Sequence, residues 1–341
     1  MNKDSDRNYN LDLLRILACL AVIAIHSTDH LLYGQPVGNN SWIFANVVQS
    51  FSRWAVPVFV MISGALMINS EQSKSAIDFY TKRIKKIIIP LLFWSFTYWL
   101  LGLWTLDGQI DFAMFLKSLA EGNPYPWHFY FLFVILGLYL VTPLINQLFV
   151  RLSRRDILIA TLVSVASAIT WETVNVFTTA SINNAVTLFM PYLSYYLLGY
   201  YISTSKTIDT GKRLFWGFAG LSVVIAVVST IISASFGLLD GLQLFNYFNP
   251  ILILSSVCIF VAMLKSSFIL SKKIKSLIQE VASLTFGVYL IHLLLIKIIL
   301  EIFGHNYSIL LSVGIFVLST ICSFVVIRIM RTNPVLRMVA P

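Results

Sequence analysis

Charged residues are scarce in this chain. Of its 341 residues, 24 are Lys or Arg and 15 are Asp or Glu, which together amount to 11%. Polar stretches long enough to form a separate soluble domain are also missing, because apolar runs recur from Leu11 to Ile329. Hydrophobic residues make up 58% of the chain, and the mean hydropathy is +0.82. Since these values exceed what a soluble protein needs for its core, the sequence predicts one membrane domain over residues 1–341.

Cysteine is rare, and motifs of two common kinds of hydrolytic site are absent from the sequence. Cys19, Cys258 and Cys322 lie in separate apolar runs without a C-x-x-C spacing. We therefore expect small packing residues and no disulfide framework or thiolate metal site. No G-x-S-x-G segment supports serine-hydrolase chemistry, and no H-E-x-x-H segment supports a metal centre, so we expect no metal cofactor.

The net charge of +9 does not point to nucleic acid as a partner. The basic residues form short clusters between the apolar runs, which is the pattern that sets the orientation of membrane helices. With a cytoplasmic N-terminus, all basic residues except Arg53, Lys117 and Lys297 fall inside or at the inner boundary. The first apolar run carries Asp12 and Arg15 and is followed by no small-residue cleavage pattern, so we predict a retained span and no signal peptide.

Apolar runs long enough to cross a bilayer are abundant. A helix needs about 20 apolar residues to cross the hydrocarbon core. Division of the chain at charges and turn residues predicts an all-α polytopic membrane protein with about ten transmembrane helices and both termini in the cytoplasm. The predicted spans cover residues 10–32, 43–68, 86–104, 128–149, 157–174, 186–203, 214–235, 247–264, 280–302 and 308–328. In the outer linker at 105–127, the apolar residues from Phe112 to Leu119 predict an amphipathic interfacial helix.

Ionisable residues follow one side of the first span. Arg15 and His26 are eleven residues apart, and a helical step of about 100° per residue brings their side chains to within about 20° of one direction. Side chains that point near the same direction are Asp12, Cys19, Asp29 and His30. Such a stripe is costly against lipid, so we expect it to face the bundle interior or water and to mark a path or site.

A structural role explains some members of this stripe better than others. Asp12 and Arg15 could form an ion pair one turn apart, with Arg15 as an anchor at the inner boundary. For Asp29 and His30, an ordinary place at the outer boundary is preferred over a chemical role. His26 differs, because a buried imidazole in lipid is expensive without a function, and its two nitrogens suit it to exchange a proton with a hydroxyl group.

Later spans carry further polar side chains. The second span places Asn46, Gln49, Arg53 and Pro57 at helical spacing. Arg53 could contact substrate, or it could form a salt bridge to Asp29 or Glu172 that only locks the bundle. Tyr289 and His292 lie three residues apart, so one helix face could bring both to the first span, or a structural hydrogen bond could explain them. An interfacial aromatic belt explains Trp127 well and His128 less well.

Five segments form an ordered set of motifs. Residues 10–26 contain an arginine and a histidine with ten residues between them; 56–64 end in Ser-Gly; 80–90 are strongly basic; 126–132 are aromatic; and 286–292 contain Tyr-Leu-x-His. Together these segments resemble the acyltransferase-3 family of membrane O-acyltransferases. The likeness extends over most of the chain, and it is greatest to short members without an attached soluble domain, such as those that acetylate surface polysaccharides.

The resemblance implies an enzyme that transfers acyl groups other than amino-acyl groups. Its donor would be an acyl-coenzyme A, most often acetyl-CoA, that approaches from the cytoplasm, and its acceptor a hydroxyl group of a cell-surface or lipid-linked glycan. His26 would act as general base or as a transient acyl carrier, with Arg15 as the second member of the catalytic set. The location implied is the plasma or inner membrane of the cell, among membrane lipids.

Arg83, Lys82 and Lys86 are the expected donor-binding residues, together with Arg15, because clustered cations suit the phosphates of coenzyme A. Topology signalling alone is the alternative explanation for the cluster. The family usually has arginine at both ends of an R-x-x-R spacing, whereas Lys86 stands at the second end here. Lysine keeps the charge and loses the bidentate geometry, which weakens the assignment of Lys86 to phosphate binding.

The acceptor is expected to contact Arg53, Asp29, His128, His292 and Tyr289.

Two other functions could also explain the ionisable residues in the membrane spans. A polysaccharide transporter or flippase would use the ionisable stripe as a path, although that function does not explain the basic cluster. A membrane-embedded ligand sensor is less favoured, because the soluble domain attached to such relatives is not expected here.

Overall fold

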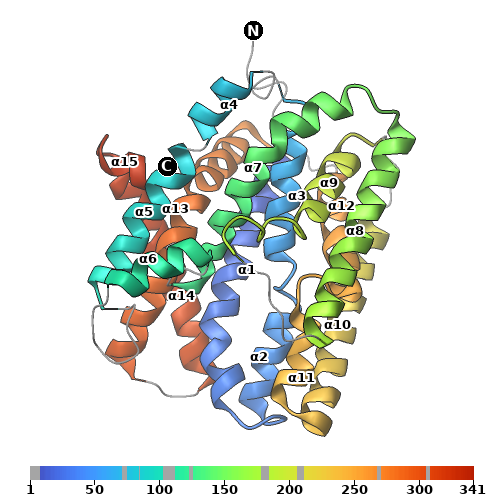
Figure 1. Ribbon diagram of the computed structural model, residues 1–341. Helices are drawn as coiled ribbons and strands as arrows, with labels where there is room; N and C mark the ends of the chain where they lie inside the picture. Colours follow the sequence, from blue (N-terminus) through green and yellow to red (C-terminus); the bar gives the residue numbers. More distant parts are fainter. Residues whose placement is uncertain are drawn as a thin grey trace. The chain divides into compact units, whose positions relative to one another are not determined.

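The computed structural model describes residues 8–70, 75–83, 85–102, 112–122, 126–177, 184–205, 211–266, 270–304 and 308–341 (Figure 1). Every regular element among these residues is helical, which confirms the all-α class. The helices are α1 Tyr9–Gly34, α2 Asn40–Ser50, α3 Ala55–Met67, α4 Ala76–Arg83, α5 Lys85–Leu100, α6 Phe112–Glu121, α7 Tyr130–Phe149, α8 Arg154–Phe177, α9 Leu193–Ser203, α10 Gly211–Phe236, α11 Leu238–Leu242, α12 Pro250–Leu264, α13 Lys272–Phe303, α14 Ile309–Met330 and α15 Leu336–Val339, with 3-10 helices η2 Trp127–Phe129 and η3 Gln243–Phe245.

Eight helical segments in the described part of the chain are long and apolar enough to cross a membrane. They correspond to eight of the predicted spans and confirm a polytopic membrane protein. The predicted spans 86–104 and 186–203 contain shorter helices, α5 with 16 residues and α9 with 11. At about 1.5 Å per residue, α5 covers about 24 Å of the roughly 30 Å hydrocarbon core. Turns occupy residues 184–192 before α9, where Pro191 lies, so the predicted count of ten is not confirmed.

The predicted interfacial helix corresponds to α6. Its residue Phe115 is buried, and the Phe115 ring packs 5.6 Å from the ring of Trp99 on α5. Phe112 remains exposed. Residues 123–125, which come shortly after α6, lie outside the described part of the chain. The apolar pattern of this linker therefore predicted a helix correctly, and its buried face packs against a neighbouring helix.

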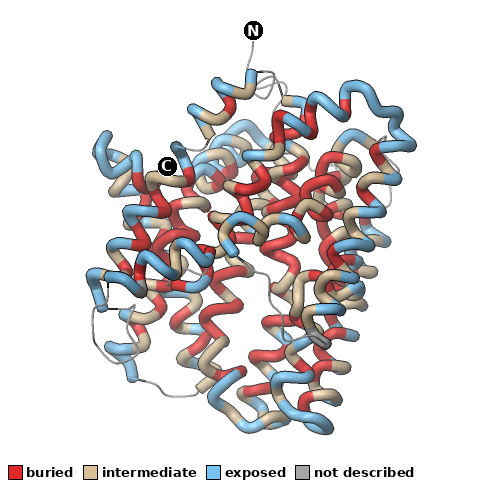
Figure 2. Tube along the Cα trace, in the orientation of Figure 1, coloured by how far each residue is buried: buried red, intermediate tan, exposed pale blue. Residues whose placement is uncertain are grey.

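Two compact units make up the chain. The first contains Met1–Phe59 and Lys206–Arg331, and the second contains Val60–Ser205 and Thr332–Pro341. In the first unit, α1 packs against α2, α12, α13 and α14, while α10 packs against α2 and α12. Figure 2 shows buried residues along most of α1. Because several helices pack against α1, its buried polar side chains face other parts of the protein, as the cost of exposing them to lipid predicts.

An interruption between α2 and α3 determines where Arg53 lies. Residues 51–54 form turns, and α3 starts at Ala55 with Pro57 as its third residue. Proline has no backbone N–H and is tolerated in the first turn of a helix, so Pro57 fits the start of α3 and would have broken a continuous helix. The Trp54 Nε1 atom donates to the Phe51 carbonyl oxygen at 2.7 Å, which fixes the turn. Arg53 is therefore held in a turn at the end of α2.

The second unit contains a close helix crossing built on glycine. A Cβ atom on Gly64 of α3 would lie 1.9 Å from the Tyr196 carbonyl oxygen of α9, and one on Gly199 would lie 2.0 Å from the Met61 carbonyl oxygen. Both contacts are with backbone, so no side-chain movement relieves them. Gly64 and Gly199 therefore permit the close approach of α3 and α9, which is the usual role of small residues between membrane helices.

Candidate functional site

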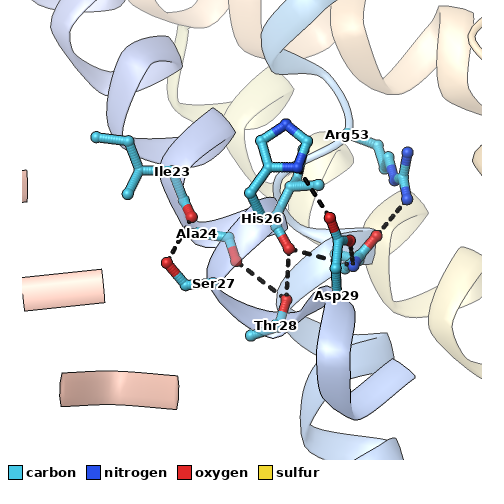
Figure 3. A network of polar contacts seen from close by, with 9 residues as sticks. Ile23, Ala24, His26, Ser27, Thr28, Asp29 and Arg53 are labelled. Atoms are coloured by element: carbon cyan, nitrogen blue, oxygen red, sulfur yellow. Dashed lines mark hydrogen bonds and ion pairs between the residues drawn. The ribbon is translucent and has the colours of Figure 1, made fainter. Parts of the chain in front are cut away.

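His26 and Asp29 form a hydrogen-bonded pair on one turn of α1. The His26 Nδ1 atom lies 2.8 Å from the Asp29 Oδ2 atom (Figure 3). The His26 side chain is 5% exposed and that of Asp29 is 28% exposed. The helix itself creates the pair, since residues three apart lie on the same face. An ordinary place at the outer boundary was preferred for Asp29, and the structure shows that one helical turn also links it to the buried histidine.

The Asp29 carboxylate selects which nitrogen of His26 carries the proton. An ionised carboxylate only accepts hydrogen bonds, so the Nδ1–H group of His26 donates to it. In the neutral ring, the lone pair is then on Nε2, which is the nitrogen that can accept a proton. When Nε2 accepts a proton, the ring becomes positively charged. The negative carboxylate that is hydrogen-bonded to Nδ1 stabilises this charge.

Gln49 holds the second oxygen of the Asp29 carboxylate. The Gln49 Nε2 atom donates to Asp29 Oδ1 at 2.8 Å and to the Ile25 carbonyl oxygen at 3.3 Å. Gln49 has no exposed surface, and it comes from α2, which packs on α1. Its side-chain oxygen accepts a hydrogen bond from the Arg53 guanidinium. Arg53, Gln49, Asp29 and His26 thus form a continuous hydrogen-bonded series that ends on the imidazole.

Arg53 reaches Asp29 through Gln49 and not by the direct salt bridge that was considered. Its charge still acts electrostatically on the Asp29 carboxylate. The guanidinium carbon lies 4.9 Å from the centre of the Phe245 ring, and the group also contacts the side chain of Tyr33. Phe245 belongs to a buried apolar cluster with Leu31 and Trp42, among others. The aromatic stacking and the Gln49 bond therefore fix Arg53 in one orientation.

His292 of α13 lies beside His26. The two ring centres are 5.4 Å apart, and His292 has no exposed surface. The His292 Nδ1 atom donates to the Tyr289 carbonyl oxygen at 2.7 Å, and the Tyr289 ring centre lies 5.9 Å from that of His292. Of the two alternatives left open for this segment, both are present at His292, which contacts the first helix and also forms a structural hydrogen bond to the Tyr289 carbonyl oxygen. Two histidines from distant parts of the sequence therefore meet at this site.

Arg15 lies near the N-terminal end of α1. Its Nη1 atom is 3.7 Å from Asp12 Oδ1, so the ion pair that the spacing predicted is present. Asp12 is buried, whereas 29% of the Arg15 side chain is exposed. Eleven residues of helix separate Arg15 from His26, which corresponds to about 16 Å along the axis. Cys19 lies between them and donates through its Sγ atom to the Thr285 carbonyl oxygen at 3.7 Å, a packing role for this member of the stripe.

The other predicted site residues belong to the second unit. Lys82 and Arg83 end α4, and Lys86 lies at the start of α5. Lys82 and Lys86 are exposed, while Arg83 is half-buried. His128 of η2 is buried against aromatic rings, 4.5 Å from the ring centre of Phe129 and 6.2 Å from that of Tyr98. In the described residues, no group of three or more His, Cys, Asp or Glu side chains could hold a metal ion.

Sequence analysis did not name Gln49 as a site residue, and it did not predict the His26–Asp29 pair. The His-x-x-Asp spacing on one helix face was a usable signal for Asp29. For Gln49, helical spacing showed that it shares a face with Arg53, but no sequence pattern showed that this face meets Asp29. His30, on the same helix, instead pairs with Ser312 of α14 at 3.2 Å.

Comparison with known proteins gives one family. The family model described as an acyltransferase domain, of the acyltransferase-3 type, matches residues 8–328. This match covers both units and every residue of the site described above. Neither the comparison with curated proteins nor that with solved structures found a match.

Proposed function

Since the chain belongs to the acyltransferase-3 family, we propose that it transfers an acyl group, in the simplest case acetyl, from cytoplasmic acyl-coenzyme A to a glycan hydroxyl group. The acceptor would be a cell-surface or lipid-linked glycan, and the protein would lie in the plasma or inner membrane with both termini inside. The observation that carries this proposal is the His26–Asp29 pair, because a buried imidazole oriented by a carboxylate is suited to general-base catalysis.

In the proposed reaction, His26 Nε2 takes the proton of the acceptor hydroxyl group as its oxygen attacks the thioester carbonyl carbon. A carbon–oxygen bond forms, the carbon–sulfur bond breaks, and the coenzyme A thiolate takes the proton back from His26. Asp29 stabilises the transient imidazolium, so its role is to position and support the base. A transient acyl group on the imidazole would use the same nitrogen, and acyl-enzyme trapping distinguishes the two routes.

The positively charged residues are proposed to bind the donor. Arg83 offers a half-buried guanidinium for phosphate, with Lys82 and Lys86 as exposed point charges. Arg15 is proposed as a donor contact at the inner end of α1, where about a third of its side chain remains accessible.

The proposed acceptor contacts are those close to His26. His292 and Tyr289 approach from α13, and Arg53 lies beyond Asp29 in the hydrogen-bonded series. Asp29 itself is now assigned to the orientation of His26 and no longer to acceptor binding. His128 is kept as a proposed acceptor contact from the family resemblance.

Transfer in detergent distinguishes an enzyme from a transporter. Purified protein is incubated with labelled acetyl-CoA and candidate glycan acceptors, without any sealed compartment. The proposal predicts label in the glycan at a rate proportional to protein. If label moves only across sealed vesicles and never into a covalent product, the function is transport and the proposal is wrong.

A further inference from the structure

Asn146, on the inner half of α7, has a buried amide group of which only one side is used. The residue is 8% exposed, and its Oδ1 atom accepts from the Asn69 backbone N–H at 2.8 Å. Its Nδ2 atom is buried and has no hydrogen-bond partner in the described part of the chain. Two N–H donors buried without acceptors lose their hydration and gain nothing in return, so this arrangement is expected where a ligand supplies the acceptor.

A rigid polar seam between α7 and α9 holds Asn146 in place. Asn69, at the end of α3, adopts a left-handed conformation with a φ of 55°, and its Nδ2 atom donates to the Tyr200 hydroxyl group at 2.6 Å. One helical turn before Asn146, the Thr142 Oγ1 atom lies 2.7 Å from the Tyr196 hydroxyl group. The neighbouring polar side chains are thus bonded to one another, whereas the Asn146 Nδ2 group has no acceptor among the described residues.

A guanidinium group lies close to this seam. Arg83 acts electrostatically on the Tyr196 hydroxyl group. Its helix α4 packs on α7, where the Tyr80 hydroxyl group donates to the Leu140 carbonyl oxygen at 2.8 Å. Amide and guanidinium groups both donate hydrogen bonds, and the guanidinium adds positive charge. Their natural complement is an oxyanion, of which phosphate is the common case.

Asn46 in the first unit shows the contrasting case of a structural asparagine. Its Nδ2 atom donates to the Ala226 carbonyl oxygen at 2.8 Å and to Thr230 Oγ1 at 2.9 Å. Its Oδ1 atom accepts from Ser229 Oγ at 2.9 Å. Asn46 is 1% exposed, so its burial is similar to that of Asn146 while every donor is used. An unused amide is therefore not a general feature of buried asparagines in this chain.

We propose that Asn146 is a donor-binding residue whose Nδ2 group hydrogen-bonds a phosphate oxygen of acyl-coenzyme A beside Arg83. The inference rests on the proposed function, because that function supplies the phosphorylated donor. Since Nδ2 is covered in the described structure, the donor must displace the side chains over it, and binding is accompanied by a local opening.

Coenzyme A binding to the full-length protein tests this site without any turnover. The protein is placed in nanodiscs of phosphatidylcholine, and the Kd of coenzyme A is measured by calorimetry. Asn146→Asp keeps the oxygen that accepts from Asn69 and replaces the donors by a negative charge, while Asn146→Ala removes the amide. Loss of a hydrogen bond to a charged group predicts a Kd at least about 10-fold higher for both variants.

Two controls separate a ligand contact from a structural effect. Asn46→Asp should lower the Tm and leave the Kd of coenzyme A unchanged. Pantetheine, which lacks the phosphates, should bind the parent and the Asn146 variants with equal Kd. Addition of phosphatidylglycerol tests whether a lipid headgroup is the phosphate source, since it would then compete with coenzyme A in the parent protein.

Each outcome has a defined meaning. If the folded Asn146→Asp and Asn146→Ala proteins bind coenzyme A as tightly as the parent, Asn146 is not a donor contact and this inference is wrong. If phosphatidylglycerol binding depends on Asn146 while coenzyme A binding does not, the site takes a lipid and the inference is also wrong. If the parent itself does not bind coenzyme A, the donor class in the proposed function is wrong, and the inference is overturned with it.

Discussion

At the scale of single residues, the orientation of one imidazole depends on three other side chains. Asp29 fixes the tautomer of His26, Gln49 fixes Asp29, and Arg53 fixes Gln49. Removal of a partner in such a series leaves a buried polar group without its hydrogen bond. The free-energy cost of that unsatisfied group is larger than the net stabilisation that the hydrogen bond provides. The series therefore predicts that substitutions at a distance from His26 change the rate of transfer.

Asp29→Asn removes the negative charge and keeps the shape of the side chain. The amide can present its NH2 group to His26 Nδ1, which would move the proton to Nε2 and remove the base. We expect kcat to fall about 100-fold, within the range typical for general-base catalysis, with little change in the KM for acetyl-CoA. Steady-state kinetics on purified protein measure both, and a kcat within twofold of the parent would contradict the role assigned to Asp29.

Gln49→Glu keeps the oxygen that accepts from Arg53 and replaces the donor to Asp29 by a second carboxylate oxygen. Repulsion between the two carboxylates should displace Asp29 from His26, so we expect kcat to fall about 10-fold or more at unchanged KM for acetyl-CoA. The same change at the exposed Gln147 of α7 is the control and should have no effect. Equal kinetics for the two variants would show that Gln49 only fills space.

The sequence predicted His26 because its chemistry is unusual in an apolar run and its spacing from Arg15 is a family feature. The roles of Gln49 and Asp29 depend on how α2 packs against α1, and the amphipathic spacing of one helix carries no information about its partner. His292 was named from the resemblance, yet its ring contact with His26 also required the packing of α13. Local pattern therefore identified candidate residues, and tertiary packing decided which of them meet.

At the scale of helices, hydropathy predicted the eight spans that the structure describes as long apolar helices, and the other two predicted spans contain places where the chain is apolar without being regularly helical. Residues 184–192 and the end of α5 at Leu100 are such places. An average over about 20 residues does not detect turns made by Pro191 or by Gly102, which has a φ of +68°. The close crossing of α3 and α9 likewise depends on two single glycines, Gly64 and Gly199, and mean hydropathy does not reveal it.

Gly64→Ala and Gly199→Ala should each prevent normal packing of α3 on α9. The new Cβ atom would lie 1.9 Å and 2.0 Å from a carbonyl oxygen, respectively, so the helices must separate. We expect at least about 3 kcal/mol of destabilisation, seen as a lower Tm and a lower yield in detergent. Gly314→Ala in α14 is the matched control, because nothing lies within 4 Å of its added Cβ atom. A Gly64→Ala protein as stable as Gly314→Ala would contradict the described crossing.

At the scale of the whole molecule, the basic clusters predict that both termini are cytoplasmic. Fluorescent protein fused after Pro341 should fold and emit light, whereas alkaline phosphatase at the same point should be inactive. Phosphatase inserted after Gly122, within the predicted outer linker, should be active. The opposite pattern would reverse the topology and with it the proposed cytoplasmic approach of the donor.

The account as a whole depends on His26 as the group that handles the acceptor proton. The most direct measurement compares His26→Ala with His30→Ala, one helical turn away on α1 and paired with Ser312. Purified proteins of equal Tm are given labelled acetyl-CoA and the glycan acceptor. The account predicts that His26→Ala loses about 100-fold or more of the transfer rate and that His30→Ala stays near the parent. Transfer by folded His26→Ala at the rate of the parent would contradict it.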